Sequence, residues 1–337
     1  MNITKITLTT LTFSLMASHI MADDQQPSGS SDIIIKGAKL ETLWNEGDFT
    51  EGVAVDRNGL IYFSDIPFNK NAGRVMKYDP KTGAVSVHCA DSGKSNGLMF
   101  DAKGRLIAAC GAMWGKQALV EITPNGTVNV LADKYKGKRL NSPNDLVVHP
   151  NRSIYFSDPR YAGDEPMEIK EMSVYRYTPS GKVQRVTHDI EKPNGLGISP
   201  DGKILYVAET NNGTTEVRKM DPNVKPGRMT LNAFPIKKNG TLGRKKVLVD
   251  FGKETGVDGM TIDSRGNIYA AVRSKKRHGI YVFSPKGKEL AYIPTAVLPT
   301  NCCFGRGKDG HSLYITAGKG LFRIRVKTKG SFPLDGK

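Results

Sequence analysis

The sequence has few cysteines, and their spacing does not fit a zinc site. The four cysteines are Cys89, Cys110, Cys302 and Cys303. Neighbouring residues of a strand point to opposite faces, so Cys302 and Cys303 should not both enter one metal site. Buried free thiols are therefore the expectation. A Cys89–Cys110 disulfide is the alternative, because an exported chain can form one.

The motifs of two common functional classes are also missing. The chain contains no Gly-x-Ser-x-Gly, so a serine-hydrolase nucleophile elbow is not indicated. The formal net charge is +16, with basic clusters at 134–139, 237–246 and 273–277. Tyr135 is the one aromatic residue within these clusters, and no nucleic-acid motif accompanies them. We therefore predict solvated loop faces and no nucleic-acid partner.

Long apolar runs are missing after the first residues of the chain. A basic start at Lys5 precedes the mostly apolar, uncharged run 6–21, and the small residue Ala22 then precedes Asp23. This pattern is typical of a secretory signal peptide, and the run is short and Thr/Ser-rich for a membrane span. We predict a signal peptide at 1–22 and a flexible leader at 23–32. The protein is then periplasmic or secreted without stable membrane insertion, and the sequence leaves its oligomeric state open.

What the sequence does contain is one unit repeated six times. Each copy is a β-rich run, a short polar turn and a second β-rich run. The copies are 53–65, 98–110, 146–158, 196–208, 260–272 and a looser one at 302–316. Five of them carry a glycine after a polar residue in the turn, which is the chemistry of a tight hairpin with positive backbone angles.

Further strands follow each hairpin, so each repeat predicts one four-stranded antiparallel blade. The expected fold is all-β, a six-bladed β-propeller over 33–330 with a C-terminal tail at 331–337. Residues 38–44 are expected to supply the outer strand that closes the last blade. The Pro-, Gly- and Lys-containing segment 222–243 is expected to be an inserted loop or a hairpin extension.

An acid or an amide recurs just before the innermost strand of every repeat. These residues are Glu51, Asn96, Asn144, Asn194, Asp258 and Asn301. Because the pseudo-symmetry aims all six at one axis, their oxygens would converge, which is costly without a cation. Calcium accepts carboxylate and amide oxygens together, whereas the ring has no His or Cys for zinc or copper. Any single Asn-Gly or Asp-Gly pair could instead be only a turn.

The order of these motifs resembles the senescence marker protein and gluconolactonase (regucalcin-like) family of calcium-dependent six-bladed propellers. The segments that carry the resemblance are Glu51-Gly52 with 61–65, 139–145, 155–159, 192–196 and 257–263. It implies that Glu51, Asn144, Asn194 and Asp258 bind the metal, with Asn144 also beside the substrate. Asp258 also matches the proposed catalytic acid or base of the family.

The resemblance implies a calcium-dependent lactonase that opens a sugar lactone to the aldonic acid, with Zn²⁺, Mg²⁺ or Mn²⁺ as other candidate cations. The substrate-binding candidates are Asn96, Asn144, Arg139, Arg160 and Tyr161. Ser142 stands where animal members carry an arginine, so the substrate is the least specified element. The alternatives are a non-catalytic ligand-binding propeller and a metal-dependent esterase or phosphotriesterase on the same site.

Overall fold

The computed structural model describes residues 26–219, 221 and 223–334. The predicted signal peptide and the first residues of the leader lie outside this range, so export stays a prediction. Within the described part of the chain, no helix is long and apolar enough to cross a membrane.

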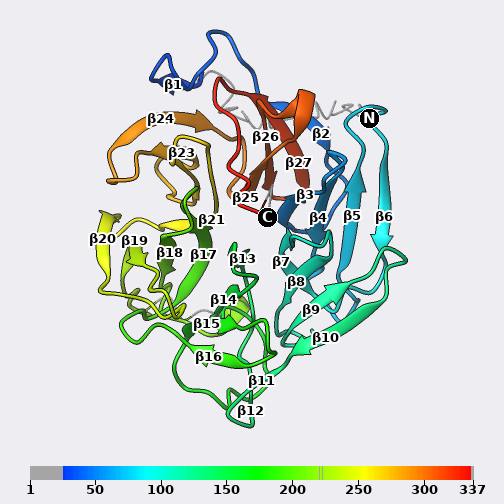
Figure 1. The fold of residues 1–337 in the computed structure, drawn as a ribbon, viewed down its shortest axis with the longest axis vertical. Helices are drawn as coiled ribbons and strands as arrows, with labels where there is room; N and C mark the ends of the chain where they lie inside the picture. Colours follow the sequence, from blue (N-terminus) through cyan, green and yellow to red (C-terminus); the bar gives the residue numbers. More distant parts are fainter. Residues whose placement is uncertain (1–25, 220, 222, 335–337) are drawn as a thin grey trace, which may run out of the picture.

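Six antiparallel sheets surround a central axis, as Figure 1 shows, and this confirms the predicted six-bladed propeller. Blades one and two are β3 (Thr50–Val55), β4 (Ile61–Asp65), β5 (Arg74–Tyr78) and β6 (Val85–Cys89), then β7 (Ser95–Phe100), β8 (Leu106–Cys110), β9 (Ala118–Ile122) and β10 (Val128–Ala132). Blades three and four are β13 (Leu146–Val148), β14 (Ile154–Asp158), β15 (Ser173–Tyr177) and β16 (Val183–Arg185), then β17 (Pro193–Ile198), β18 (Ile204–Thr210), β19 (Met229–Pro235) and β20 (Lys246–Asp250). Blade five is β21 (Val257–Ile262), β22 (Ile268–Val272), β23 (Gly279–Phe283) and β24 (Glu289–Pro294).

The sixth blade is assembled from both ends of the chain. Its strands are β25 (Pro299–Phe304), β26 (Ser312–Ala317), β27 (Gly320–Arg325) and, from the N-terminal side, β2 (Glu41–Trp44). The register pairs Thr42 with Phe322, so the prediction that residues 38–44 close the ring is confirmed. This closure ties the segment that leads into the first blade to the last blade through backbone hydrogen bonds.

Part of the predicted flexible leader belongs to the propeller. The short strand β1 (Ser28–Gly29) pairs with β24 at the outer edge of blade five. Ile33, which follows it, is buried between blades five and six. The pairing of β1 and the burial of Ile33 fix this segment in place, although its polar composition had indicated flexibility.

The turns inside the predicted hairpins follow the expected chemistry. Gly59, Gly104, Gly202 and Gly266 all adopt positive φ, and in the copy without a glycine Arg152 takes the same conformation at φ 68°. The segment predicted as an inserted loop, 222–243, is corrected because it contains β19, the third strand of blade four. Pro226, Gly227, Gly240 and Gly243 lie on either side of that strand, and Pro235 is its last residue.

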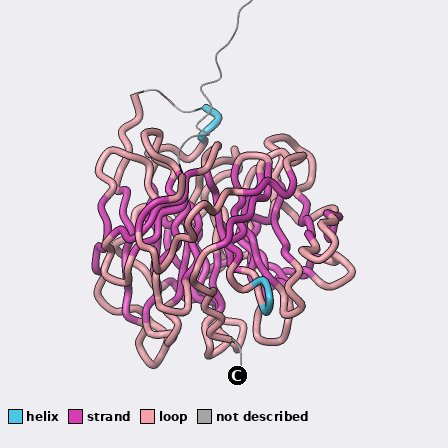
Figure 2. Tube along the Cα trace, turned by 90° about the horizontal axis from the view of Figure 1, so that it is seen from above, coloured by secondary structure: helices cyan, strands magenta, loops and turns pink. Residues whose placement is uncertain are grey.

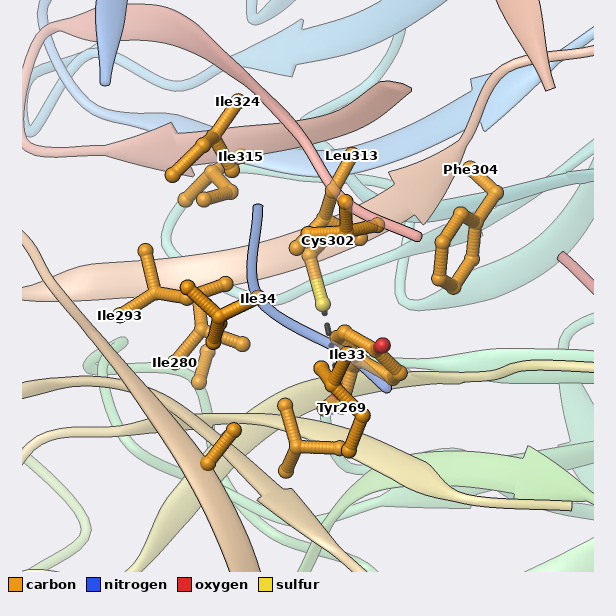
Figure 3. Close-up of a cluster of buried hydrophobic side chains, with 14 residues drawn as sticks. Ile33, Ile34, Tyr269, Ile280, Ile293, Cys302, Phe304, Leu313, Ile315 and Ile324 are labelled. Carbon is orange, nitrogen blue, oxygen red and sulfur yellow. Dashed lines mark hydrogen bonds between the residues drawn. The ribbon is translucent and has the colours of Figure 1, made fainter. Parts of the chain in front are cut away.

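Neighbouring blades pack through apolar side chains. Figure 3 shows the cluster between blades five and six, where the thiol of Cys302 donates to the backbone oxygen of Tyr269 over 3.3 Å. All four cysteines are buried free thiols, which agrees with the default expectation. Burial raises the pKa of Cys302 far above its ordinary value, so this thiol is unreactive.

One small hairpin and two 3₁₀ turns lie outside the blade strands in the described part of the chain. The strands β11 (Lys134–Tyr135) and β12 (Lys138–Arg139) form a two-stranded hairpin outside the blades. The 3₁₀ turns η1 (Val217–Lys219) and η2 (Gly307–Asp309) are the only helical turns in the described part of the chain. Figure 2 shows the strands in the middle of the molecule, with loops gathered at the two ends of the channel.

Candidate active site

β-Bulges interrupt the innermost strands at one end of the channel, which we call the mouth. The strand register shifts between Glu51 and Val53, and equivalent shifts occur at residues 95–98, 193–196, 257–260 and 299–301. A bulge bends its strand and changes where a side chain points. Five blades therefore carry the same irregularity where the sequence has its recurring acid or amide.

The glycines after the ring residues explain the bulges. A Cβ on Gly52 would lie 2.0 Å from the backbone oxygen of Asn96, and one on Gly195 would lie 2.1 Å from that of Asp258. Gly97 and Gly259 are equally crowded by the next blade. The recurring x-Gly pairs are therefore not turns. They are places where adjacent inner strands touch, which brings the preceding side chains close to the axis.

Asp258 and Asn194 form the centre of this ring. The Asn194 side-chain nitrogen donates to Asp258 Oδ1 over 2.8 Å, and the Arg273 guanidinium lies 3.2 Å from Asp258 Oδ2. Since the Asn194 nitrogen is committed to Asp258, its oxygen is oriented elsewhere, and this buried oxygen has no hydrogen-bond partner in the structure. An amide oxygen left unpaired in a buried site needs a ligand to satisfy it.

Burial perturbs both carboxyl groups of the ring. It raises the pKa of Glu51 well above the ordinary value, and repulsion from Asp258 raises it further. Burial also raises the pKa of Asp258, although Arg273 and the hydrogen bond from Asn194 counteract part of this effect. Glu51 has one backbone donor, the N–H of Gly52 at 3.2 Å. Two poorly compensated carboxyls at one site are therefore held close together.

These groups fit a hard divalent cation. The described residues contain no cluster of three or more His, Cys, Asp or Glu side chains that could hold a metal. The ring instead combines the carboxylates of Glu51 and Asp258 with the amides of Asn144 and Asn194. This is an all-oxygen donor set of the kind that calcium takes, and the unpaired Asn194 oxygen would be satisfied by such an ion.

The ring forms the floor of a cavity of about 320 Å³, which is large enough for a small-molecule ligand. All four predicted metal ligands line it, including Asn144, which is also a predicted substrate-binding residue. Two further predicted substrate-binding residues, Asn96 and Tyr161, line it as well. The Tyr161 hydroxyl donates to the backbone oxygen of Thr210 over 2.8 Å. Burial raises the pKa of Tyr161 well above its ordinary value, so the phenol stays protonated.

The two predicted substrate-binding arginines do not line the cavity. Arg139 is exposed on the outer hairpin, where it contacts Glu168 and the side chain of Gln117. Arg160 is only 1% exposed, and its guanidinium donates to three backbone carbonyls, including that of Asn141 at 2.9 Å. Arg160 therefore shapes the loop that presents Tyr161 instead of contacting a ligand itself.

Arg273 is a cavity-lining residue that the sequence interpretation missed. It belongs to a basic cluster that was expected to be solvated, yet its side chain is 22% exposed and lines the cavity. Strand pairing supplies the signal that could have found it, because Val257 lies opposite Val272. Arg273 directly follows Val272 at the end of β22, level with Gly256 at the mouth, and from there its side chain reaches Asp258.

Comparisons with known proteins agree with this geometry. The family model described as SMP-30/Gluconolactonase/LRE-like region matches residues 49–319. A gluconolactonase from Zymomonas mobilis is 32% identical over 311 residues, which cover 86% of this chain and 82% of the relative. Regucalcin from Bos taurus is 25% identical, and the alignment covers 83% of this chain and 88% of that protein. A solved structure of a gluconolactonase from Xanthomonas campestris superposes with a TM-score of 0.76 at 28% identity, covering 91% and 96% of the two chains.

Proposed function

The chain belongs to the SMP-30/gluconolactonase/LRE-like family, and we propose that its acid and amide ring hydrolyses lactones to hydroxy acids with the help of a divalent cation. The protein is a lactonase and therefore a hydrolase of carboxylic esters. The observation that carries the site assignment is the Asn194 amide, which donates to Asp258 and leaves its own buried oxygen free for a ligand. Glucono-1,5-lactone is the reference substrate, because two of the similar proteins are gluconolactonases.

Calcium is the cation that we propose, on the basis of the donor chemistry. Glu51, Asn144, Asn194 and Asp258 would hold it with carboxylate and amide oxygens. A bound divalent cation supplies Lewis-acid polarisation of the ester carbonyl. Regucalcin-like relatives support a divalent metal in this family, and Zn²⁺, Mg²⁺ and Mn²⁺ are the alternatives to test.

Asp258 is the proposed general base and acid of the reaction. Its carboxylate would take a proton from the attacking water as the carbonyl carbon–oxygen bond forms. The same group would return the proton to the ring oxygen when the lactone C–O bond breaks, which releases the hydroxy acid. Arg273 and Asn194 fix the orientation of the Asp258 carboxylate for this role.

Arg273 has a second proposed role in the same step. Its guanidinium lies in the cavity wall beside Asp258 and has more N–H groups than the Asp258 pair and the Pro299 carbonyl use. A donor at this position can stabilise the negative charge that develops on the carbonyl oxygen in the transition state.

Metal removal and replacement test this proposal. Purified protein should lose hydrolysis of glucono-1,5-lactone when treated with a chelator, and one cation out of Ca²⁺, Zn²⁺, Mg²⁺ and Mn²⁺ should restore it. The Asp258→Asn variant should remain inactive under every condition while keeping the circular dichroism of the wild type. A parallel panel of simple esters and phosphotriesters identifies the alternative activities. If all substrates are inert while calorimetry detects bound cation, the site is a binding site and the catalytic assignment is wrong.

A further inference from the structure

The wall of the catalytic cavity is chemically different from its floor. The floor consists of the acid and amide ring, whereas apolar side chains form much of the wall that rises from it. These side chains are Phe49, Ile66, Phe68, Met113 and Val217. A ligand whose reacting group lies on the ring therefore has its remaining atoms against a hydrocarbon surface.

Several polar residues of the wall already use their hydrogen-bonding groups within the protein. Lys94 donates its ammonium to two backbone carbonyls of the 67–69 loop, and Thr210 donates its hydroxyl to the backbone oxygen of Val257. The Tyr161 hydroxyl donates to the backbone oxygen of Thr210. Against these three residues the hydroxyls of a sugar lactone would lose water and find little hydrogen-bonding capacity to replace it, which is unfavourable.

Apolar side chains also gather at the rim of the same cavity. Phe68 and Val217, which line the cavity, are 47% and 41% exposed, and Trp114, which follows the cavity-lining Met113, is 47% exposed. The other large apolar side chains with high exposure in the described part of the chain are scattered over the molecule, namely Val87, Val130, Val247 and Val297. A concentration of exposed apolar groups at one opening marks a surface for an apolar ligand.

The loops that carry these side chains are fixed by hydrogen bonds. Glu165 accepts the backbone N–H groups of Met113 and Trp114, at 3.2 and 2.6 Å. The backbone N–H of Val217 donates to the carbonyl of Tyr161 over 2.8 Å. The ring of Phe68 packs edge-on against Phe49 with 5.2 Å between centroids. The apolar wall is therefore preformed and does not need to order itself around a ligand.

We propose that the preferred substrate of this enzyme is a lactone that bears a hydrocarbon substituent, with the ester on the ring of oxygens and the substituent against the apolar wall. This inference rests on the proposed lactonase function and extends it to a substrate class. Polyhydroxylated sugar lactones are then the weaker substrates, because their hydroxyls face the same wall.

The metal-loaded protein is tested with δ-lactones whose alkyl substituent grows from none to six carbons, with glucono-1,5-lactone in the same series. We expect kcat/KM to rise by about two- to fourfold for each of the first methylenes and to exceed that of glucono-1,5-lactone. The matching alkyl δ-lactams, which resist hydrolysis, should bind with affinities that increase along the same series when measured by calorimetry.

Two substitutions by polar side chains of similar size test whether the apolar wall causes this dependence on chain length. Val217→Thr and Met113→Gln should flatten the dependence on chain length, measured within each variant as the ratio of kcat/KM for the six-carbon-substituted lactone to that for the unsubstituted one. Val130→Thr is the matched control, because Val130 is an exposed valine of the outer strand β10. It should leave the whole series unchanged.

The outcomes separate this inference from the proposed function. If kcat/KM is independent of chain length, or if glucono-1,5-lactone is the best substrate, the inference is wrong and the lactonase assignment stands. If no lactone reacts but lactam affinity increases with chain length, the proposed function fails while the apolar wall is supported as a binding surface. If neither lactones nor lactams respond to chain length, the apolar wall has no role in recognition.

Discussion

The two ends of the central channel are built from the same six strands and have opposite character. At the mouth the inner strands are bulged, and the cavity of about 320 Å³ has carboxylates and amides on its floor. At the other end the strands are regular and the space is about 90 Å³, lined mainly by apolar side chains. One end therefore retains polar groups that need a ligand, and the other is packed like a protein core.

The C-terminal tail produces much of this difference. Its chain enters at Gly330, which bridges to Asp263, and the N–H of Ser331 donates to a carbonyl of β21 over 2.9 Å. Phe332 then packs against two apolar clusters, and Leu334 is buried against a third. The predicted tail is thus the closure of the channel.

Asn144 and Asp145 are neighbours in the chain, but their side chains have different surroundings. Asn144 faces the catalytic cavity, whereas the Asp145 carboxylate accepts the backbone N–H groups of Leu146 and Leu196, both at 2.9 Å. Burial raises the pKa of Asp145 to about 7. Asp145 joins blade three to blade four, so adjacent residues of one motif serve function and architecture separately.

The largest expected effect comes from Glu51→Gln at the mouth. Loss of a buried ligand carboxylate should lower kcat/KM for the best lactone by about a thousandfold. The metal-free variant should unfold at the same temperature as the wild type or above it, because burial already disfavours the charged form of Glu51. Calorimetric melting with and without calcium, together with lactone kinetics, measures both quantities.

The matched control is Glu46→Gln, because Glu46 is exposed and close in sequence. It should change neither activity nor the calcium-dependent rise in melting temperature. A Glu51→Gln variant that is active but strongly destabilised would mean that the mouth residues serve the fold, and the contrast between the two ends would disappear.

Phe332→Ala at the closed end should have a smaller effect, and this effect should be on stability and not on activity. Removing this ring from two apolar clusters should cost about 2 to 3 kcal/mol of unfolding free energy. The value of kcat/KM should stay within twofold at a temperature where the variant is folded. Urea denaturation and lactone kinetics provide the two measurements.

Phe68→Ala is the corresponding variant at the mouth, and it should lower activity more than it lowers stability. Phe68 is half exposed, so its removal should cost little stability while it lowers activity toward alkyl-substituted lactones. If Phe332→Ala reduces activity as much as Phe68→Ala, the closed end is coupled to catalysis and is not only structural.

The last prediction concerns the pH dependence of stability at Asp158, in the loop that supports the mouth. Asp158 accepts the N–H groups of Asn141 and Ser142, and burial raises its pKa from 3.8 to about 7. The folded protein therefore binds this proton more tightly than the unfolded chain, so the wild type should lose stability as pH rises from about 4 to 7. Asp158→Asn lacks this titration.

The unfolding free energy of the wild type minus that of Asp158→Asn should therefore decrease as the pH rises across that range. Chemical denaturation at several pH values, with the metal removed, measures it. A difference that is constant with pH would show that Asp158 is ionised in both states and that its two backbone donors outweigh burial.

The sequence predicted the repeat architecture well because each blade is specified locally. Alternating β-rich runs and glycine turns act within about a dozen residues, so the hairpins and their number could be read directly. The outer pairing of residues 38–44 with the last blade also followed, since a ring needs a closing strand. The segment 222–243 was misinterpreted because Pro and Gly flank β19 and obscured its apolar pattern.

The site was only partly predictable. The ring residues precede the inner strands at a common register, so Glu51, Asn144, Asn194 and Asp258 could be identified and the structure brings them together. Arg139 and Arg160 were chosen for their charge and position near a motif, but charge does not indicate which way a loop turns. Arg273 was missed because its partner depends on a pairing between strands β21 and β22.

The sequence by itself determined the six blades, the recurring acid or amide and the glycine after it, because these depend on local backbone preferences and repetition. Only the tertiary structure decided which side chains face the mouth, which arginine reaches Asp258, and that the tail fills the opposite end. Those outcomes depend on contacts between blades that are distant in the chain. The close approach of Gly52 to Asn96 and of Gly195 to Asp258 exists only after the ring has closed.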